Sequence, residues 1–152
     1  MKREDNKSQC PINFTVEILG DTWSLLIVRD MLALGKKTFG EFLDSKERIG
    51  PSVLTERLVH LERKGIIFKE PSLTDKRKFN YSLTEKGLEL IPIVYEIAVW
   101  GSKNSPNPEA PEVWFQSLKH GKEKVINLWY EAVRSGSSFF NGPNSVVKML
   151  EL

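Results

Sequence analysis

Apolar positions in the first part of the chain follow helical spacing. Residues 11–20 carry an apolar set that ends at a glycine, and residues 23–34 form a second, strongly apolar segment. Asp21 is suited to cap the second helix at its start, and Gly35 lies just beyond its end. The pattern therefore predicts two consecutive helices.

Two further helix starts follow. Thr38 and Glu41 have the spacing of a capping box, which predicts a short helix over residues 39–45. Pro51 opens the next predicted helix, residues 51–64, because its fixed φ suits the first helical position. Along that helix one apolar stripe repeats at i, i+4 and i+7. The stripe consists of Leu54, Leu58 and Leu61.

After Gly65 the pattern changes from helical to extended. Two short runs rich in β-branched and aromatic residues, 66–70 and 78–83, flank a polar loop that contains a proline, and together they predict a hairpin. A long helix is expected over residues 85–103, with Thr84 as its cap. Three packed helices followed by a hairpin indicate a mainly helical α+β fold with a small wing, the winged helix-turn-helix.

Residues 104–152 form a C-terminal extension that begins with a segment rich in proline, asparagine and serine. Helices are expected over 111–119 and 122–134, and a terminal turn or helix over 146–152. The extension is rich in aromatic residues, which we expect to pack on the long helix or at a dimer seam; a small-molecule pocket is the alternative. These residues are Trp114, Phe115, Trp129, Tyr130, Phe139 and Phe140.

Composition indicates a globular protein of one domain with an appendage. Of 152 residues, 40% are hydrophobic and 28% are charged, and these values disfavour wholesale disorder. No apolar run is long enough to span a membrane, and the N-terminal segment lacks the apolar core of a secretory signal. The single cysteine cannot form an internal disulfide, so we expect a cytoplasmic protein.

Basic residues concentrate in one region. The net charge is only +2, yet residues 46–78 hold nine lysines and arginines against five acidic residues. A local basic surface can hold phosphate without an extreme pI, although an ordinary solvated face has the same composition.

Seven short motifs stand in a fixed order along the chain. They are CP at 10–11, GDTWSLLI at 20–27, FGEF at 39–42, IGPSVLTERL at 49–58, LERKGII at 61–67, YSLTEKG at 81–87 and WG at 100–101. Each is weak alone, but together they resemble the HxlR family of bacterial regulators, relatives of the MarR-type winged-helix proteins. The resemblance implies a homodimeric regulator that binds double-stranded DNA, often near stress or detoxification genes. The DNA-binding domain would cover 1–103 and include the dimerisation helix, whereas 104–152 lie outside the resemblance.

The predicted helix 51–64 is the candidate for contacting DNA bases. A recognition helix needs one face against the core and the other toward the major groove. At about 100° per residue, six residues, most of them polar, lie on the side of the helix opposite the leucine stripe or next to that side. Ser52 suits either a phosphate or a hydrogen bond at the helix start. The predicted DNA-facing residues of this helix are Ser52, Thr55, Glu56, Val59, His60 and Arg63.

Two further basic features accompany this helix. Arg57 lies beside the apolar stripe, where it can contact a phosphate or pair with a carboxylate of a neighbouring helix. The resemblance places an arginine here, and we expect it to contact the DNA backbone. The basic wing, residues 71–78, carries the consecutive cations Lys76, Arg77 and Lys78, which suit the DNA backbone or the minor groove unless they are merely solvated.

The helix 85–103 is apolar on two sides. One side can pack on its own domain, which leaves the other for a second copy or for the C-terminal extension. Pro92 inside the helix predicts a kink. A symmetric dimer would place two recognition helices about 34 Å apart, and such a repressor would bind a near-palindromic operator. The candidate dimer contacts are Leu90, Ile93, Ile97 and Trp100.

Cys10 precedes Pro11 at the start of the first helix. In the family that the chain resembles, a cysteine here sometimes senses oxidants or electrophiles, which requires an exposed thiolate. Without a second cysteine in the chain, switching would need an intersubunit disulfide, a mixed disulfide or an adduct. The alternative is a small buried apolar residue, with regulation by a small-molecule effector or by none.

No catalytic pattern is present in the sequence. His60 and His120 lie far apart without metal-ligand spacing, and no Ser-His-Asp or phosphate-loop motif occurs. We therefore expect no enzyme activity, no metal and no cofactor. The main rival to a DNA-binding regulator is a winged-helix module for protein–protein contact.

Overall fold

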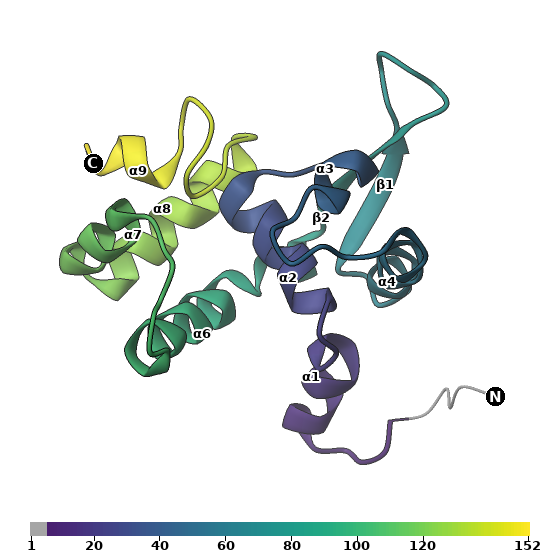
Figure 1. Ribbon diagram of the computed structural model, residues 1–152, viewed down its shortest axis with the longest axis horizontal. Helices are drawn as coiled ribbons and strands as arrows, with labels where there is room; N and C mark the ends of the chain where they lie inside the picture. Colours follow the sequence, from purple (N-terminus) through teal and green to yellow (C-terminus); the bar gives the residue numbers. More distant parts are fainter. Residues whose placement is uncertain (1–5) are drawn as a thin grey trace. The chain divides into compact units, whose positions relative to one another are not determined.

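The chain folds into two compact units in the computed structural model, which describes residues 6–152 (Figure 1). Residues 85–103, predicted as one long helix, belong to the same compact unit as the C-terminal extension. The predicted division between a DNA-binding domain and an extension at residue 103 stays a prediction. The first unit holds the described residues up to Val28 together with Lys37–Thr84, and the second holds Arg29–Lys36 and Glu85–Leu152.

The first unit has the predicted order of helices and strands. The two strands pair antiparallel, from Ile67 opposite Leu83 to Pro71 opposite Phe79. The structure confirms the mainly helical fold with a small hairpin. The elements are α1 (Pro11–Leu19), α2 (Ser24–Arg29), α3 (Phe39–Leu43), α4 (Pro51–Arg63), β1 (Ile67–Pro71) and β2 (Phe79–Leu83).

α3 begins with the predicted capping box. Thr38 Oγ1 accepts a hydrogen bond from the Glu41 N–H at 3.2 Å, and the Glu41 carboxylate accepts one from the Thr38 N–H at 2.9 Å. Burial opposes ionisation of Glu41, but the backbone hydrogen bonds from Lys37 and Thr38 outweigh it and lower the pKa of this carboxyl. The Tyr81 N–H donates to the Lys37 carbonyl at 2.7 Å, so the segment before α3 is attached to β2.

The leucine stripe of α4 forms the centre of this unit's core. Leu54, Leu58 and Leu61 are all buried, as the spacing predicted. Phe42 of α3 is also buried and meets the ring of Tyr81 edge-on, with centroids 6.1 Å apart. The core therefore holds α4 by one face and leaves its opposite face outside.

The second predicted helix changes its hydrogen-bond pattern halfway. α2 gives way to a π-helical turn, η1 (Asp30–Leu34), which ends at Gly35 with φ +74°, a left-handed conformation that favours glycine. Asp30 is buried, and its carboxylate pairs with Arg29 at 2.6 Å and with Lys36 at 2.9 Å. The buried charge is thus held by two cations of the second unit.

The prediction of a single helix over residues 85–103 is wrong. α5 (Glu85–Leu88) ends, and α6 (Ile91–Asn104) begins with Pro92 in its first turn. Proline lacks an N–H and clashes with the preceding turn, so it is accepted at a helix start and breaks a helix interior. The expected kink is therefore a break. The remaining elements are α7 (Glu112–Ser117), the 3₁₀ turn η2 (Leu118–His120), α8 (Lys122–Arg134) and α9 (Val146–Met149).

Aromatic rings of the extension form the core of the second unit. Phe139 contacts Trp129 and Trp114, with ring centroids 4.8 and 5.4 Å away, and Trp114 contacts Tyr95 of α6 at 5.8 Å. Trp114 thus packs on α6 as predicted for the rings of the extension, whereas the ring–ring contacts of Trp129, Phe139 and Phe140 lie within the extension itself. Over residues 6–152, no helix has the length and apolar character needed to cross a membrane.

The extension also satisfies the carbonyl end of η1. Phe139 N–H and the indole Nε1–H of Trp129 both donate to the Leu32 carbonyl, at 3.1 and 2.8 Å. Phe140 N–H donates to the Ala33 carbonyl at 3.0 Å, and the Asn141 side chain donates to the next carbonyl at 3.1 Å. The last carbonyls of a helix have no intrahelical partner, so these donors replace solvent at that end.

Candidate nucleic-acid interface

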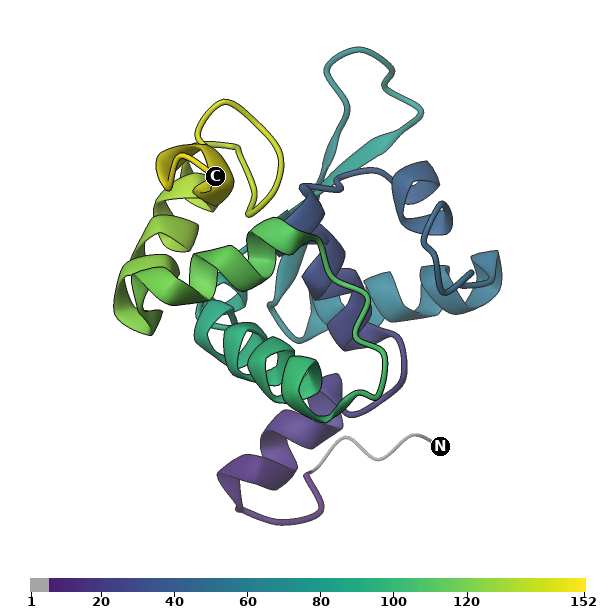
Figure 2. The same ribbon diagram turned by 60° about the vertical axis from the view of Figure 1, so that its left-hand side comes forward.

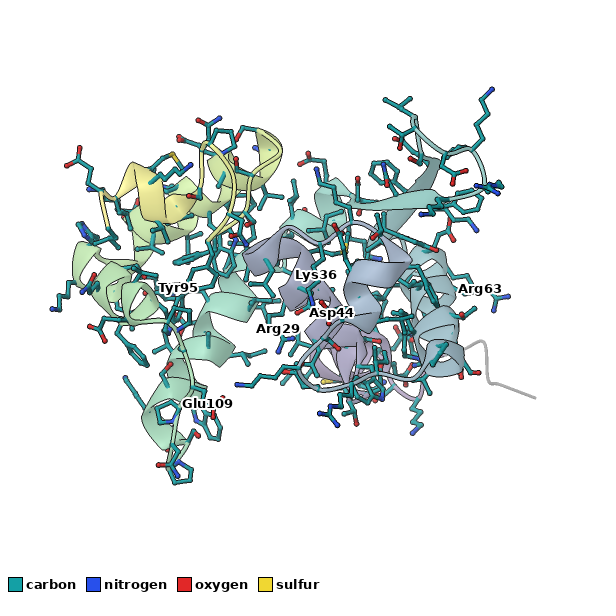
Figure 3. All side chains as sticks on the ribbon, turned by 45° about the horizontal axis from the view of Figure 1, so that its top comes forward. Arg29, Lys36, Asp44, Arg63, Tyr95 and Glu109 are labelled. Carbon is teal, nitrogen blue, oxygen red and sulfur yellow. The ribbon has the colours of Figure 1, made fainter. Side chains whose placement is uncertain are left out.

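The face of α4 opposite its buried leucines is open to solvent. Figure 3 shows Arg63 pointing away from this helix. The members of the face recur at intervals of three or four residues, so they lie on one side of the helix. The structure thus gathers five of the predicted residues into one surface, called here the α4 face: Ser52, Thr55, Glu56, Val59 and Arg63.

The hydroxyl group of Thr55 is already oriented. Its Oγ1 donates to the Pro51 carbonyl at 3.0 Å. The proton is therefore directed into the helix, and the oxygen lone pairs and the methyl group remain outside. This arrangement suits acceptance from a base amino group or apolar contact with a thymine methyl group.

His60 has an internal partner instead of an exposed position. The ring is half-buried, and its Nε2–H donates to the carbonyl of Ile18 in α1 at 2.9 Å. His60 therefore does not share the exposed surface with the other predicted residues of α4. The neighbouring helix explains this, because this side of α4 faces α1 and not open solvent.

Arg57 adopts the alternative arrangement, a pairing with carboxylates. Its side chain is only 15% exposed, and its guanidinium lies 3.4 Å from Asp21 and 2.6 Å from Glu56. The expected contact between Arg57 and the DNA backbone is therefore not supported by the geometry. The guanidinium instead ties α4 to Asp21, in the turn that precedes α2.

Asp21 is a residue whose full role the sequence did not reveal. Its Oδ1 accepts from the N–H groups of Trp23 and Ser24 at 2.9 Å each, which confirms it as the cap of α2. Burial disfavours its charge, but the hydrogen bonds from Ser24 and Trp23 and the charge of Arg57 outweigh this and lower the pKa of the carboxyl. The negative charge of Asp21 therefore lies between the start of α2 and Arg57 of α4, and it links the two helices.

The loop between β1 and β2 extends beyond the strands (Figure 1, Figure 2). It is ordered by its own groups: Ser72 N–H donates to the Lys78 carbonyl at 2.8 Å, and Lys78 N–H donates to the Asp75 carbonyl at 2.9 Å. The Asp75 carboxylate accepts from the side chain and N–H of Arg77, and these bonds lower its pKa. Lys76, Arg77 and Lys78 are all exposed, but one of the three charges is paired on the loop itself.

The predicted dimer residues separate into two groups. Ile93, Ile97 and Trp100 are exposed, Trp100 at 69%, and they follow one another at helical spacing along α6. Leu90 is only 7% exposed, so it packs inside the second unit. Leu90 precedes the start of α6 at the break before Pro92, which removes it from the exposed stripe.

Cys10 is exposed and stands at the start of α1. Its carbonyl accepts the first backbone hydrogen bond of the helix, from Phe14 N–H at 3.0 Å, while its side chain forms no capping bond. The alternative interpretation, a small buried apolar residue, is therefore wrong for this position.

A family of known proteins matches the part of the chain that contains α2 to α6. The sequence model described as an HxlR-like helix-turn-helix matches residues 18–109. The chain is 40% identical over 103 residues to an uncharacterised HTH-type transcriptional regulator, YybR, of Bacillus subtilis. This alignment covers 65% of this chain and 78% of YybR. It is 35% identical over 99 residues to a second such regulator of B. subtilis, YdeP, with 65% and 77% covered.

Two solved structures are similar in fold. The redox regulator HypR, in its oxidised form, superposes with a TM-score of 0.57 and 35% identity, over 66% of this chain and all of HypR. The reduced form of the transcriptional regulator YodB of B. subtilis gives a TM-score of 0.53 and 26% identity, over 67% of this chain and all of YodB.

Proposed function

The chain belongs to the HxlR-like helix-turn-helix family of transcriptional regulators, and from this premise we propose that it is a homodimeric repressor of bacterial genes. It would act in the cytoplasm, without catalytic activity, on a near-palindromic operator in double-stranded DNA. The observation that carries the proposal is the exposed α4 face in the same unit as a loop of exposed cations. A core-anchored helix with a free polar face is what major-groove recognition needs.

Each part of this surface would make a different contact. Thr55 and Glu56 would contact base edges, with Glu56 accepting from a cytosine amino group. Ser52 and the two exposed wing lysines, Lys76 and Lys78, would contact phosphates and so set position and affinity. Arg57 would contribute indirectly, by holding α4 against Asp21.

The exposed stripe of α6 supports the homodimer. Ile93, Ile97 and Trp100 present apolar side chains that the protomer leaves uncovered. Burying apolar surface is the main favourable term in association, and a two-fold axis would let the stripe cover its own copy. The same axis would relate two α4 helices and explain a palindromic operator.

The first experiment is a titration of labelled DNA from the region upstream of the gene, with unrelated competitor DNA and at several salt concentrations. We expect binding that survives competitor and weakens steeply with salt. The double variant Lys76→Ala/Lys78→Ala should bind more weakly and lower the salt slope by about 0.9 for each phosphate that is no longer neutralised. Lys119→Ala/Lys124→Ala, which removes two exposed lysines of the extension, is the matched control and should leave the slope unchanged.

Failure to bind that region, followed by an empty selection from random DNA, would contradict the proposal. The winged helix would then serve protein–protein contact. Wild-type binding with no effect of the wing substitutions would keep the regulator and remove the wing from its DNA contacts.

A redox response is the second candidate function, and the exposure of Cys10 favours it. HypR is a redox regulator and shares 35% identity with this chain. Two Cys10 thiolates, one from each protomer, would lose two electrons to an oxidant such as diamide and form one intersubunit disulfide; diamide takes up the electrons and two protons. An electrophile would instead form an adduct with the same sulfur.

The redox proposal is tested by treating wild type and Cys10→Ser with diamide. Wild type should migrate as a covalent dimer on a non-reducing gel and change its DNA affinity, reversibly with dithiothreitol. Cys10→Ser should do neither. An equal response in both proteins would contradict a sensor role for Cys10 and favour a small-molecule effector.

A further inference from the structure

The loop between β1 and β2 carries an exposed leucine. Leu73 is 101% exposed, whereas Ile12, the next most exposed large hydrophobic residue among those described, is 74% exposed. The folded protomer buries none of this side chain, so Leu73 contributes none of the roughly 1.5–3 kcal/mol of stabilisation that a buried leucine provides. A singly exposed hydrophobic residue is common on protein surfaces, so the exposure of Leu73 gains meaning only from the ordered, cationic loop that carries it.

The loop holds this leucine in place rather than leaving it on an open chain. The Thr74 N–H donates to Ser72 Oγ at 3.3 Å, and the two hydroxyl oxygens lie 3.1 Å apart. Ser72 N–H closes the loop on the Lys78 carbonyl at 2.8 Å. Leu73 therefore lies between two residues that are tied together and to the far side of the loop.

The charges around Leu73 select the partner. Lys76, Arg77 and Lys78 follow within five residues, and the one acidic group of the loop, Asp75, is paired with Arg77. A basic surround favours a polyanion. The minor groove of DNA has phosphates along both edges, sugars along its walls and base pairs at its floor. Proteins that bind this groove insert leucine and similar side chains between base steps.

We propose that Leu73 inserts into the DNA minor groove beside the half-site that α4 contacts, while Lys76 and Lys78 bind the flanking phosphates. The inference rests on the proposed function and assigns its wing a specificity role. Insertion unstacks a step, so Leu73 would favour operators with a flexible pyrimidine–purine step under the wing and would bend the DNA there.

The test compares wild type with Leu73→Ser, Leu73→Met and Leu152→Ser on an operator that wild type binds. Leu152→Ser removes an exposed leucine from the C-terminus and is the control. Affinity and salt slope come from titration, and the bend comes from energy transfer between dyes at the two DNA ends. Thermal melts should coincide, because Leu73 makes no buried contact.

Leu73→Ser should bind about tenfold more weakly than wild type and bend the DNA less, with an unchanged salt slope because no charge is removed. Leu73→Met, which keeps an apolar wedge, should stay within about twofold of wild type. If Leu73→Ser matched wild type in affinity and bend, the inference would be overturned, the regulator would stand, and Leu73 would belong to a protein contact. If wild type itself bound no DNA in the upstream titration and the random selection, the proposed function would fail first.

Discussion

Replacing Trp129 with phenylalanine measures how strongly the C-terminal extension stabilises the end of η1. The indole is 2% exposed, its Nε1–H donates to the Leu32 carbonyl at 2.8 Å, and its ring lies 4.8 Å from that of Phe139. Phenylalanine keeps one aromatic ring at this place. It removes the hydrogen-bond donor and the remaining part of the fused ring.

The cost follows from these two losses. The Leu32 carbonyl keeps Phe139 N–H as a second donor at 3.1 Å, so it is not left unsatisfied, and the missing hydrogen bond costs about 1 kcal/mol. Truncating a buried aromatic residue to alanine costs about 3–5 kcal/mol, and phenylalanine keeps most of the volume, so the cavity adds about 1–2 kcal/mol. The free energy of unfolding should fall by about 2–3 kcal/mol, which lowers Tm by about 5–10 °C for a chain of this size.

The assay is denaturant and thermal unfolding followed by circular dichroism, at one fixed protein concentration, because the stability of the proposed dimer would depend on that concentration. Tyr130→Phe is the control, since this half-buried neighbour loses only a hydroxyl group and should stay within about 0.5 kcal/mol of wild type. A loss below about 0.5 kcal/mol for Trp129→Phe would refute the reasoning, because neither the hydrogen bond nor the ring packing would then contribute measurably.

Three further predictions concern single positions. Thr38→Ala removes the side-chain acceptor at the start of α3 and should lower the free energy of unfolding by about 1 kcal/mol in a urea titration, whereas Thr38→Ser should recover most of it. Asp21 has a lowered pKa in the folded chain, so its contribution to stability is present above about pH 4 and disappears below it; Asp21→Asn should flatten this acid-side decline, and an unchanged profile would contradict the assignment. Gly35→Ala places a Cβ at φ +74° and near Ser138, and should cost about 1–2 kcal/mol by the same titration; a neutral result would show that the turn relaxes.

The fold was predictable wherever the information is local. The leucine stripe and Pro51 define α4, and Thr38 with Glu41 define the start of α3, because spacing and caps act within a few residues. The break before α6 was also encoded locally, in Pro92, but a proline at a helix start and a proline in a kinked helix give the same apolar pattern. The π-helical turn has no such local signal, because its carbonyls are satisfied by residues about 100 positions later.

The candidate interface divides in the same way. Exposure of Ser52, Thr55 and Val59 follows from their angle relative to the stripe, so the sequence suffices to predict it. Arg57 and His60 lie on one flank of α4, between the leucine stripe and the exposed face, where the outcome depends on which neighbouring segment is present. Their partners, Asp21 and the Ile18 carbonyl, lie 36 and 42 positions earlier, and no periodicity within α4 can identify them.

The extension therefore acts as part of the fold rather than as a tail. The whole of HypR aligns with only 66% of this chain, and the family match ends at residue 109, so α7, α8 and α9 lie outside the matched family region. In this chain these residues supply hydrogen-bond donors to three consecutive carbonyls, from Leu32 to Leu34, and an aromatic core that includes Tyr95 of α6. A carbonyl without its partner costs about 1–3 kcal/mol when it stays buried. Removing the extension would expose those carbonyls together with Tyr95 of α6. We therefore expect the folded state of η1 and α6 to depend on the extension.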